Sequence, residues 1–278
     1  MSSQKGPALF GRRHALARVY SALVEASRDE YGSAHDGRLQ RYFNNLTNFE
    51  YAETIREWLG DAHRVLVIGD AGGRDTACLR AMGKSVFALD IAPQIDAHRL
   101  VIGDAAEGLP YASGTFDGVV LAEVIEHLFD DVRALREIRR VLAPSGRLAL
   151  TTPIGNDAPE YHVRVYTPAT MRRLLQHTGF DTAELLVKGG GFAAFDGTVV
   201  GAGVKHACQL LSWKLTGRTH YRRWNGALRR ADLAFSRFAP FVHRASRHYG
   251  MFVLAVRRQS DAGPDLRRMN VGDFAYRV

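Results

Sequence analysis

Residues 64–90 read RVLVIGDAGGRDTACLRAMGKSVFALD, in which two apolar strand patterns flank a glycine-containing turn and a helical pattern. The two apolar runs, 64–69 and 85–90, have the length and composition of buried strands. The segment between them predicts a helix that ends at Gly83, because glycine commonly stops helices. A strand, a crossover helix and a second strand in this order form the repeating unit of a parallel sheet. The stretch therefore predicts an α/β fold.

The same alternation continues toward the C-terminus. Further strand patterns lie at 98–104, 116–122, 146–153 and 251–258, with helical patterns at 130–142 and 167–180. Continuous apolar strands of this kind are typical of a mostly parallel sheet covered by helices on both faces. Ligands of such sheets bind beyond the carboxyl ends of the strands. We therefore expect the functional residues to follow the strands of the first half of the sheet.

Four regions are predicted along the chain. Helical patterns at 12–32 and 48–60 make residues 1–60 an N-terminal helical segment, and residues 61–187 form the α/β core. Two further helices, at about 199–216 and 222–245, precede the last strand. Residues 188–258 are therefore predicted to be a helical insertion plus that strand, and the polar residues 259–278 a mobile tail.

Charge is distributed unevenly along the chain. The formal net charge is +8, yet residues 188–278 alone carry 16 Lys and Arg against five Asp and no Glu. Such a basic segment is either a solvated helical surface or a surface for phosphate, nucleic acid or anionic lipid, and charge alone does not choose between them. The apolar stripe of the 222–245 helix indicates packing against the core, with contact to a membrane surface as the alternative.

Cysteine content and the lack of a targeting pattern predict a cytoplasmic protein. Cys78 and Cys208 have no metal-ligand spacing and do not form a disulfide framework, which is typical of a reducing compartment. The N-terminus has no uninterrupted apolar region of the secretory type. The longest apolar run falls short of the roughly 20 residues that span a bilayer. Peripheral association with a membrane remains the alternative to a purely cytoplasmic location.

The ends of the first three strands carry residues suited to a nucleoside cofactor. The stretch GDAGG, residues 69–73, lies between a strand and a helix, so its backbone N–H groups can face a ligand. Asp90 ends the second strand, where a carboxylate can accept hydrogen bonds from both ribose hydroxyls. Asp104 follows the third strand, in a position suited to an exocyclic amine. The usual G-x-G-x-x-G is absent, which disfavours NAD.

The fourth strand is followed by AEVIEHL, residues 122–128, which combines two carboxylates and one imidazole. In a helical turn, Glu123, Glu126 and His127 are i, i+3 and i+4 and share one face, directed to the cofactor edge. Such ligands suit Mg²⁺, Mn²⁺, Fe²⁺ or Zn²⁺, and His162 in the loop after the fifth strand is the candidate fourth ligand. The alternative is a capping or solvated first turn without a metal.

The ordered set of motifs resembles the class I S-adenosylmethionine-dependent methyltransferases. The resemblance covers residues 64–187 and implies a Rossmann-like, doubly wound, mostly parallel seven-stranded sheet. It implies that S-adenosylmethionine contacts Gly69, Asp70, Ala71, Gly73, Asp90, Ile91, Asp104 and Ala105. The glycine loop would hold the methionine part, Asp90 the ribose, and Asp104 with Ala105 the adenine. The chain departs from the family where Val67 replaces an acidic residue and Ala71 a central glycine.

The Glu-x-x-Glu-His pattern with a distant His resembles the metal site of small-RNA 2′-O-methyltransferases. The Glu-x-x-Glu-His part alone also resembles the ubiquinone-pathway O-methyltransferases. The resemblance implies a divalent metal, Mg²⁺ or Mn²⁺, on Glu123, Glu126, His127 and His162, with His127 and Glu126 acting in catalysis.

Three functions are consistent with these patterns. We expect O-methylation of a vicinal diol on a small molecule, a saccharide or a lipid-linked acceptor. An RNA 2′-O-methyltransferase is the second interpretation, which the basic C-terminal third favours. A non-catalytic binding module is the third, which Val67 and Ala71 favour.

Overall fold

The computed structural model describes most of the α/β core and its last strand. The described residues are 51–70, 73–91, 100–154, 162–188, 207–209, 211–212, 215–216, 220, 223–224 and 249–259. The predicted helix at 12–32, most of the basic insertion, the tail and Ala71 lie outside them.

Seven strands form one sheet within the described residues. They are β1 (Arg64–Ile68), β2 (Ser85–Asp90), β3 (Leu100–Ile102), β4 (Phe116–Ala122), β5 (Leu142–Ile154), β6 (Phe180–Lys188) and β7 (Tyr249–Arg257). Their order is β3-β2-β1-β4-β5-β7-β6. The pairs among β1 to β5 are parallel, whereas β7 is antiparallel to both β5 and β6. The predicted mostly parallel, seven-stranded Rossmann-like sheet is therefore confirmed.

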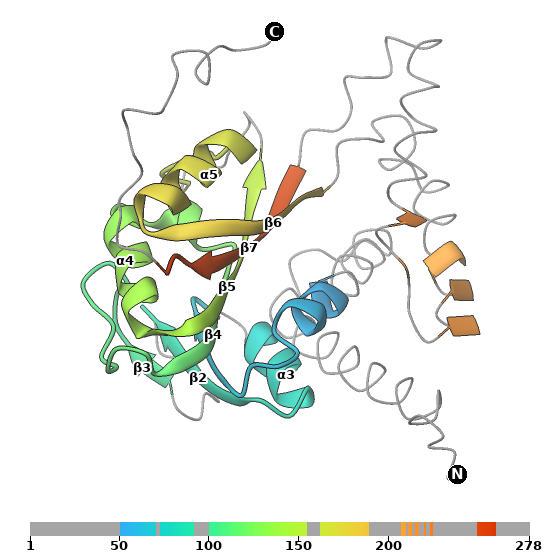
Figure 1. Cartoon of the computed structure of the whole chain (residues 1–278), viewed down its shortest axis with the longest axis horizontal. Helices are drawn as coiled ribbons and strands as arrows, with labels where there is room; N and C mark the ends of the chain where they lie inside the picture. The colour runs from blue at the N-terminus through green and yellow to red at the C-terminus, as the bar shows by residue number, and fades with distance from the viewer. Residues whose placement is uncertain are drawn as a thin grey trace, which may run out of the picture.

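Helices cover both faces of this sheet, as Figure 1 shows. The helices α4 (Asp131–Val141) and α5 (Pro168–His177) lie on one face, and α3 (Arg74–Ala81) and the helical residues 51–58 lie on the other. Each face has its own core of buried apolar side chains. One core contains Leu135 and Met171, and the other contains Ile55 and Leu79. Burial on both faces explains why the central strands are continuous apolar runs.

The predicted start of α5 is confirmed in detail. Thr167 is the N-cap: its hydroxyl accepts a hydrogen bond from the Thr170 N–H, and the Thr170 hydroxyl accepts one from the Thr167 N–H. Pro168 occupies the first turn, where its missing N–H costs no hydrogen bond. The residue pattern predicts that this helix continues to residue 180. In the structure it ends at His177, and β6 begins at Phe180. An edge strand with a bulge between Thr182 and Glu184 has no regular alternation to reveal it.

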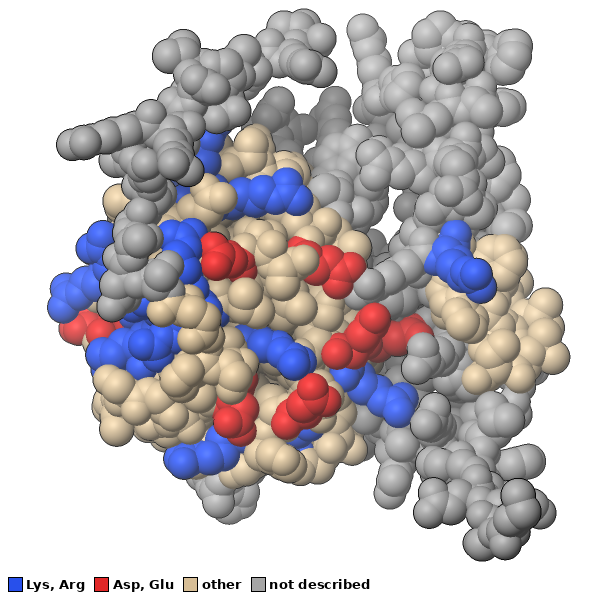
Figure 2. Space-filling view, viewed as in Figure 1, with Lys and Arg blue, Asp and Glu red and all other residues tan. Residues whose placement is uncertain are grey.

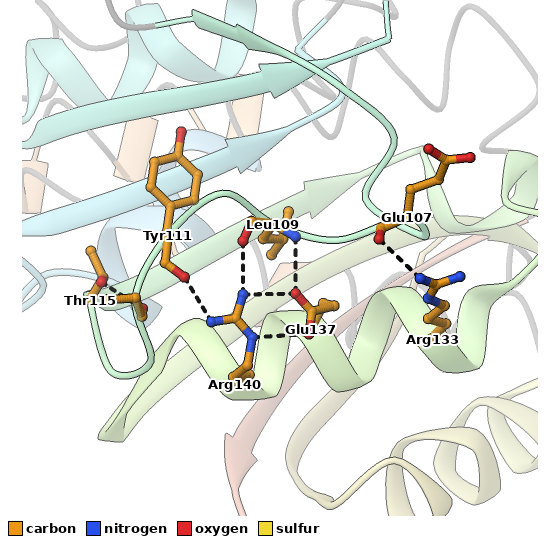
Figure 3. A network of polar contacts seen from close by, with 8 residues as sticks. Glu107, Leu109, Tyr111, Thr115, Arg133, Glu137 and Arg140 are labelled. Atoms are coloured by element: carbon orange, nitrogen blue, oxygen red, sulfur yellow. Dashed lines mark hydrogen bonds and ion pairs between the residues drawn. The ribbon is translucent and has the colours of Figure 1, made fainter.

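An arginine on α4 fixes the loop that leaves β3, as Figure 3 shows. The Arg140 guanidinium donates hydrogen bonds to the carbonyl oxygens of Tyr111 at 2.7 Å and Leu109 at 2.8 Å. Glu137 completes the arrangement, because its carboxylate accepts from the Leu109 N–H and from Arg140. Charge-assisted hydrogen bonds of this kind are the stronger ones in proteins. They anchor the connection that follows Asp104 at the cofactor edge of the sheet.

Basic side chains are not confined to the C-terminal third. Figure 2 shows Lys and Arg gathered on the side of the molecule where Figure 1 places α4.

Among the described residues, none of the helices is both long and apolar enough to cross a membrane.

Candidate active site

Three predicted site segments lie at one edge of the sheet. The register aligns Ile68 of β1 with Leu89 of β2 and with Leu121 of β4. Because these strands are parallel, the residues that follow them emerge on the same side. Gly69, Asp90 and Glu123 are therefore neighbours at the carboxyl edge, which confirms the expected placement of the motifs.

Gly69 joins the cofactor loop to the turn after β4. Its φ is +72°, and its N–H donates to the Leu89 carbonyl at 2.8 Å. A Cβ atom at this position would lie 2.4 Å from Cγ2 of Val124, far inside van der Waals contact. Both the backbone conformation and the close approach require glycine here. The loop expected to hold the methionine part thus contacts the segment that carries Glu126 and His127.

The Asp70 carboxylate caps the helix behind this loop. It is buried, and its two oxygens accept hydrogen bonds from the backbone N–H groups of Asp75 at 2.9 Å and Thr76 at 3.0 Å. These N–H groups belong to the first turn of α3, where an intrahelical partner is lacking. The N-cap residue Gly73, with φ +75°, has no side chain to do this. Contact between Asp70 and the cofactor stays a prediction, while its capping role is visible in the structure.

Burial of Asp70 makes the folding stability dependent on pH. Burial, and then the charge of Asp75, raise the pKa of Asp70 to about 7, although the Thr76 and Asp75 hydrogen bonds oppose this. The folded chain therefore holds a proton that the unfolded chain releases near pH 4, so this contribution to stability is lost as pH rises toward 7. We expect a loss of about 2 kcal/mol between pH 5 and pH 8 through this group.

Urea unfolding of the wild-type chain and of Asp70→Asn at both pH values measures this effect. The amide does not titrate, so the variant should lose less stability between pH 5 and pH 8 than the wild type. Equal losses in the two proteins would show that another group carries the dependence.

The remaining predicted cofactor residues follow β2 and β3. Asp90 is buried at the end of β2, and its carbonyl accepts from the Gly103 N–H at 2.9 Å. Ile91 is 77% exposed, so it presents an apolar side chain at the edge. The Asp104 carboxylate accepts from the Ala106 N–H at 2.8 Å, and Ala105 is buried. The structure gathers these residues along adjacent strand ends, and their contacts with a cofactor remain predictions.

The turn after β4 differs from the predicted helix. Glu123 has φ +55°, and its N–H donates to the Thr151 carbonyl of β5 at 2.9 Å. A short 3-10 helix, η1 (Ile125–His127), follows. The prediction that Glu123 shares one helical face with Glu126 and His127 is therefore wrong. The left-handed conformation at Glu123 ends the strand before the turn begins, so Glu123 is no part of a helix.

Three of the four predicted metal ligands nevertheless lie together. Glu126, His127 and His162 each offer a ligand atom, and these atoms lie within 4.8 Å of one another. Glu126 Oε1 is 3.9 Å from His127 Nε2, and the two imidazole rings are 4.9 Å apart between centroids. Glu123 is exposed and lies outside this group of described donors. Its role as a ligand stays a prediction.

Glu126 is a buried carboxyl group held by Thr152, which is not among the predicted site residues. Only 1% of Glu126 is exposed, and its Oε2 accepts a hydrogen bond from the Thr152 hydroxyl at 3.0 Å. Burial, and then the charge of Glu123, raise the pKa of Glu126 to about 7. A neighbouring cation would therefore favour the ionised form strongly. The only sign of Thr152 in the sequence is its position as a polar residue near the carboxyl end of the apolar strand β5.

The surroundings of His162 favour the neutral form of its imidazole. Burial, and then His127, lower the pKa of His162 below its ordinary value. A neutral imidazole has a free ring-nitrogen lone pair, which both metal binding and proton acceptance require.

The spacing of these donors fits a divalent ion. Ligand atoms lie about 2.1 Å from such an ion, so two of them can be at most about 4.2 Å apart. The 3.9 Å between Glu126 and His127 meets this limit. The upper bound of 4.8 Å within the group requires a closing movement of no more than about 0.6 Å. Side-chain rotation can supply a movement of that size. One carboxylate oxygen and two imidazole nitrogens suit Mn²⁺, Fe²⁺ or Zn²⁺, and Mg²⁺ with added oxygen ligands.

Known proteins share this core. The family model for a methyltransferase domain matches residues 66–150. A Mycolicibacterium smegmatis protein named a probable S-adenosylmethionine-dependent methyltransferase is 33% identical over 135 residues, covering 44% of this chain and 51% of its own length. The ubiquinone biosynthesis O-methyltransferase of Xanthomonas euvesicatoria is 31% identical over 123 residues, covering 39% and 49%. The chain thus spans about half the length of the curated relatives it matches.

A solved structure supports the fold. The Burkholderia thailandensis 1,6-didemethyltoxoflavin-N1-methyltransferase, determined with S-adenosylhomocysteine, superposes with a TM-score of 0.50 at 14% identity. The alignment covers 92% of this chain and 93% of that protein. At this identity, the likeness shows the fold alone.

The sheet order and the parallel strands define a Rossmann-like class of fold. Residues 66–150 of the chain match a methyltransferase domain, and the chain resembles class I S-adenosylmethionine-dependent methyltransferases, among them the ubiquinone-pathway O-methyltransferases. The resemblance stated from the sequence is therefore confirmed.

Proposed function

We propose that the chain is an S-adenosylmethionine-dependent, divalent-metal-assisted O-methyltransferase. The observation that carries the proposal is the group of Glu126, His127 and His162 donor atoms at the carboxyl edge of the sheet. The turn that bears two of them contacts the cofactor loop through Val124 and Gly69. Cofactor binding and acceptor chemistry would therefore take place side by side.

Glu126 and His127 differ in burial, and we propose a different role for each. Glu126 is buried and fixed by Thr152, so its carboxylate would hold and orient the metal ion. The exposed His127 can accept the proton that the acceptor hydroxyl loses. A divalent ion held by the three donors would lower the pKa of an acceptor hydroxyl and leave room for two adjacent oxygens. As the new O–CH₃ bond forms, the bond between that methyl carbon and the cofactor sulfur breaks. Alignment of the two partners is then the main remaining requirement.

The described surroundings favour an acceptor with an apolar part. Phe129, Val163 and Val165 are exposed apolar side chains on the two segments that carry the donors. Phe129 follows His127 by two residues, and Val163 directly follows His162. Such side chains are better suited to an organic acceptor than to a phosphate backbone, which basic groups bind. A vicinal diol on a small molecule, a saccharide or a lipid-linked compound is the acceptor class that we propose.

Transfer of radiolabelled methyl groups from S-adenosylmethionine tests the proposal. We expect labelling of catechol or saccharide diols, a loss of at least about 10-fold in excess chelator, and recovery when Mg²⁺ or Mn²⁺ is restored. A parallel reaction with RNA tests the second interpretation. Full activity in excess chelator contradicts metal assistance.

Calorimetric titration with S-adenosylmethionine separates the enzyme from a non-catalytic module. Absence of binding at millimolar cofactor, in spite of a folded chain, contradicts the enzyme and favours the module.

A further inference from the structure

The donors come from two segments that are far apart in sequence. Glu126 and His127 belong to the turn after β4, and His162 belongs to the segment that leads into α5. Two backbone hydrogen bonds join these segments directly. The N–H groups of Val163 and Arg164 both donate to the Glu126 carbonyl oxygen, at 2.8 and 3.2 Å. The residues beside His162 are thus attached to the residue that provides the buried carboxylate.

A buried carboxylate strengthens this junction. Asp131, the first residue of α4, is 6% exposed. Its Oδ1 lies 2.6 Å from Arg164 Nη1, and its Oδ2 accepts a hydrogen bond from the Tyr166 hydroxyl at 2.7 Å. Burial is the largest cause that raises the pKa of Tyr166 above its ordinary value, and the hydrogen bond to Asp131 follows. Tyr166 therefore stays a donor at any working pH.

The same two side chains also reach the backbone of the donor turn. Arg164 Nη2 donates to the Phe129 carbonyl at 3.0 Å, and the Tyr166 hydroxyl lies 3.4 Å from the Ile125 carbonyl oxygen. The contacts of Asp131, Arg164 and Tyr166 therefore bracket Glu126 and His127 on both sides along the chain. A guanidinium group can make these contacts at once because its donors form a rigid planar fork.

We propose that Asp131, Arg164 and Tyr166 form a positioning clamp that holds His162 at ligand distance from Glu126 and His127. The inference rests on the proposed metal-assisted function and adds residues that do not themselves provide ligand atoms. Outer residues that orient metal ligands commonly change metal affinity 10- to 100-fold when they are removed. Without the clamp, His162 would have to be ordered at the moment of binding, and affinity would fall.

The test measures Mn²⁺ binding by calorimetry on the full chain, without acceptor or turnover. We expect Arg164→Ala and Tyr166→Phe each to weaken Mn²⁺ binding about 10-fold or more. Arg164→Lys keeps the charge near Asp131 but not the fork, so it should recover part of the loss. Arg172→Ala, an exposed arginine on α5, is the matched control and should bind Mn²⁺ as the wild type does.

Two further measurements separate positioning from general stability. Thermal unfolding shows whether each variant is folded. Affinity for S-adenosylhomocysteine should stay within about 2-fold of the wild type, because the described contacts of the clamp involve none of the predicted cofactor residues. Should Arg164→Ala fail to fold, Tyr166→Phe decides, since it removes a single oxygen.

The outcomes distinguish the clamp from the function on which it rests. A wild-type chain that binds no Mn²⁺ overturns the metal centre and the clamp together. A wild type that binds Mn²⁺, with folded Arg164→Ala and Tyr166→Phe variants of equal affinity, overturns the clamp alone. Equal losses of Mn²⁺ and S-adenosylhomocysteine binding also overturn it, because they indicate a general disturbance of the core.

Discussion

Glu126→Ala is expected to lower methyl transfer by about 10³-fold, equivalent to roughly 4 kcal/mol in the activation barrier. Glu126 is the buried carboxylate of the donor group, and its removal leaves two imidazoles as the described donors. Mn²⁺ binding should be lost together with activity, while binding of S-adenosylhomocysteine should persist. Rates with saturating substrates and calorimetric Mn²⁺ titration provide the two measurements.

Two variants of other glutamates act as controls for this result. Glu107→Ala removes an exposed carboxylate from the loop anchored by Arg133, and it should leave activity unchanged. Glu123→Gln tests whether Glu123 is a metal ligand or only a neighbouring charge that repels Glu126. Because the charge of Glu123 helps to raise the pKa of Glu126, its removal should lower that pKa. A loss of Mn²⁺ binding in Glu123→Gln as large as in Glu126→Ala would instead make Glu123 a ligand.

Gly69→Ala is expected to destabilise the fold by about 3 kcal/mol and to weaken S-adenosylhomocysteine binding. The positive φ of Gly69 costs an alanine about 1–2 kcal/mol, and the new Cβ would collide with Val124 Cγ2. Val124 is branched at its β-carbon and has little freedom to rotate away. Urea unfolding and cofactor titration measure the two effects.

Gly114→Ala provides the matched control for the backbone cost. Gly114 also has φ +72°, but a Cβ there would meet nothing within 4 Å. The excess loss in Gly69→Ala therefore measures the collision, and Gly69→Ala combined with Val124→Ala should recover it. Equal losses of folding stability in Gly69→Ala and Gly114→Ala would show that the collision with Val124 does not destabilise the fold.

Most of the sheet could be predicted from sequence because its central strands are buried on both faces. Burial on two faces produces uninterrupted apolar runs such as those of β1 and β4. The edge strand β6 could not be predicted this way, since it alternates irregularly and includes a bulge. The apolar run of β7 predicts a strand, but nothing in its residue pattern places that strand between β5 and β6.

The candidate site was predictable in its residue types but not in its local geometry. Glu126, His127 and His162 were identified because carboxylates and imidazoles followed adjacent parallel strands. The positive φ of Glu123 could not be foreseen, because a non-glycine residue gives no sign of a left-handed conformation. Partners such as Thr152 and Asp131 depend on contacts between distant segments, which no spacing along the chain reveals.

The first turn of α3, behind the glycine loop, is capped by the Asp70 side chain. Asp70 already occupies two of the N–H groups with which a helix start attracts anions. A pyrophosphate placed there would meet donors in use and an acidic neighbour. A cofactor whose polar end is a zwitterion, rather than a string of phosphates, meets less opposition. The cap on α3 therefore leaves this helix start with fewer unpaired N–H donors for a phosphate group than an uncapped helix would offer.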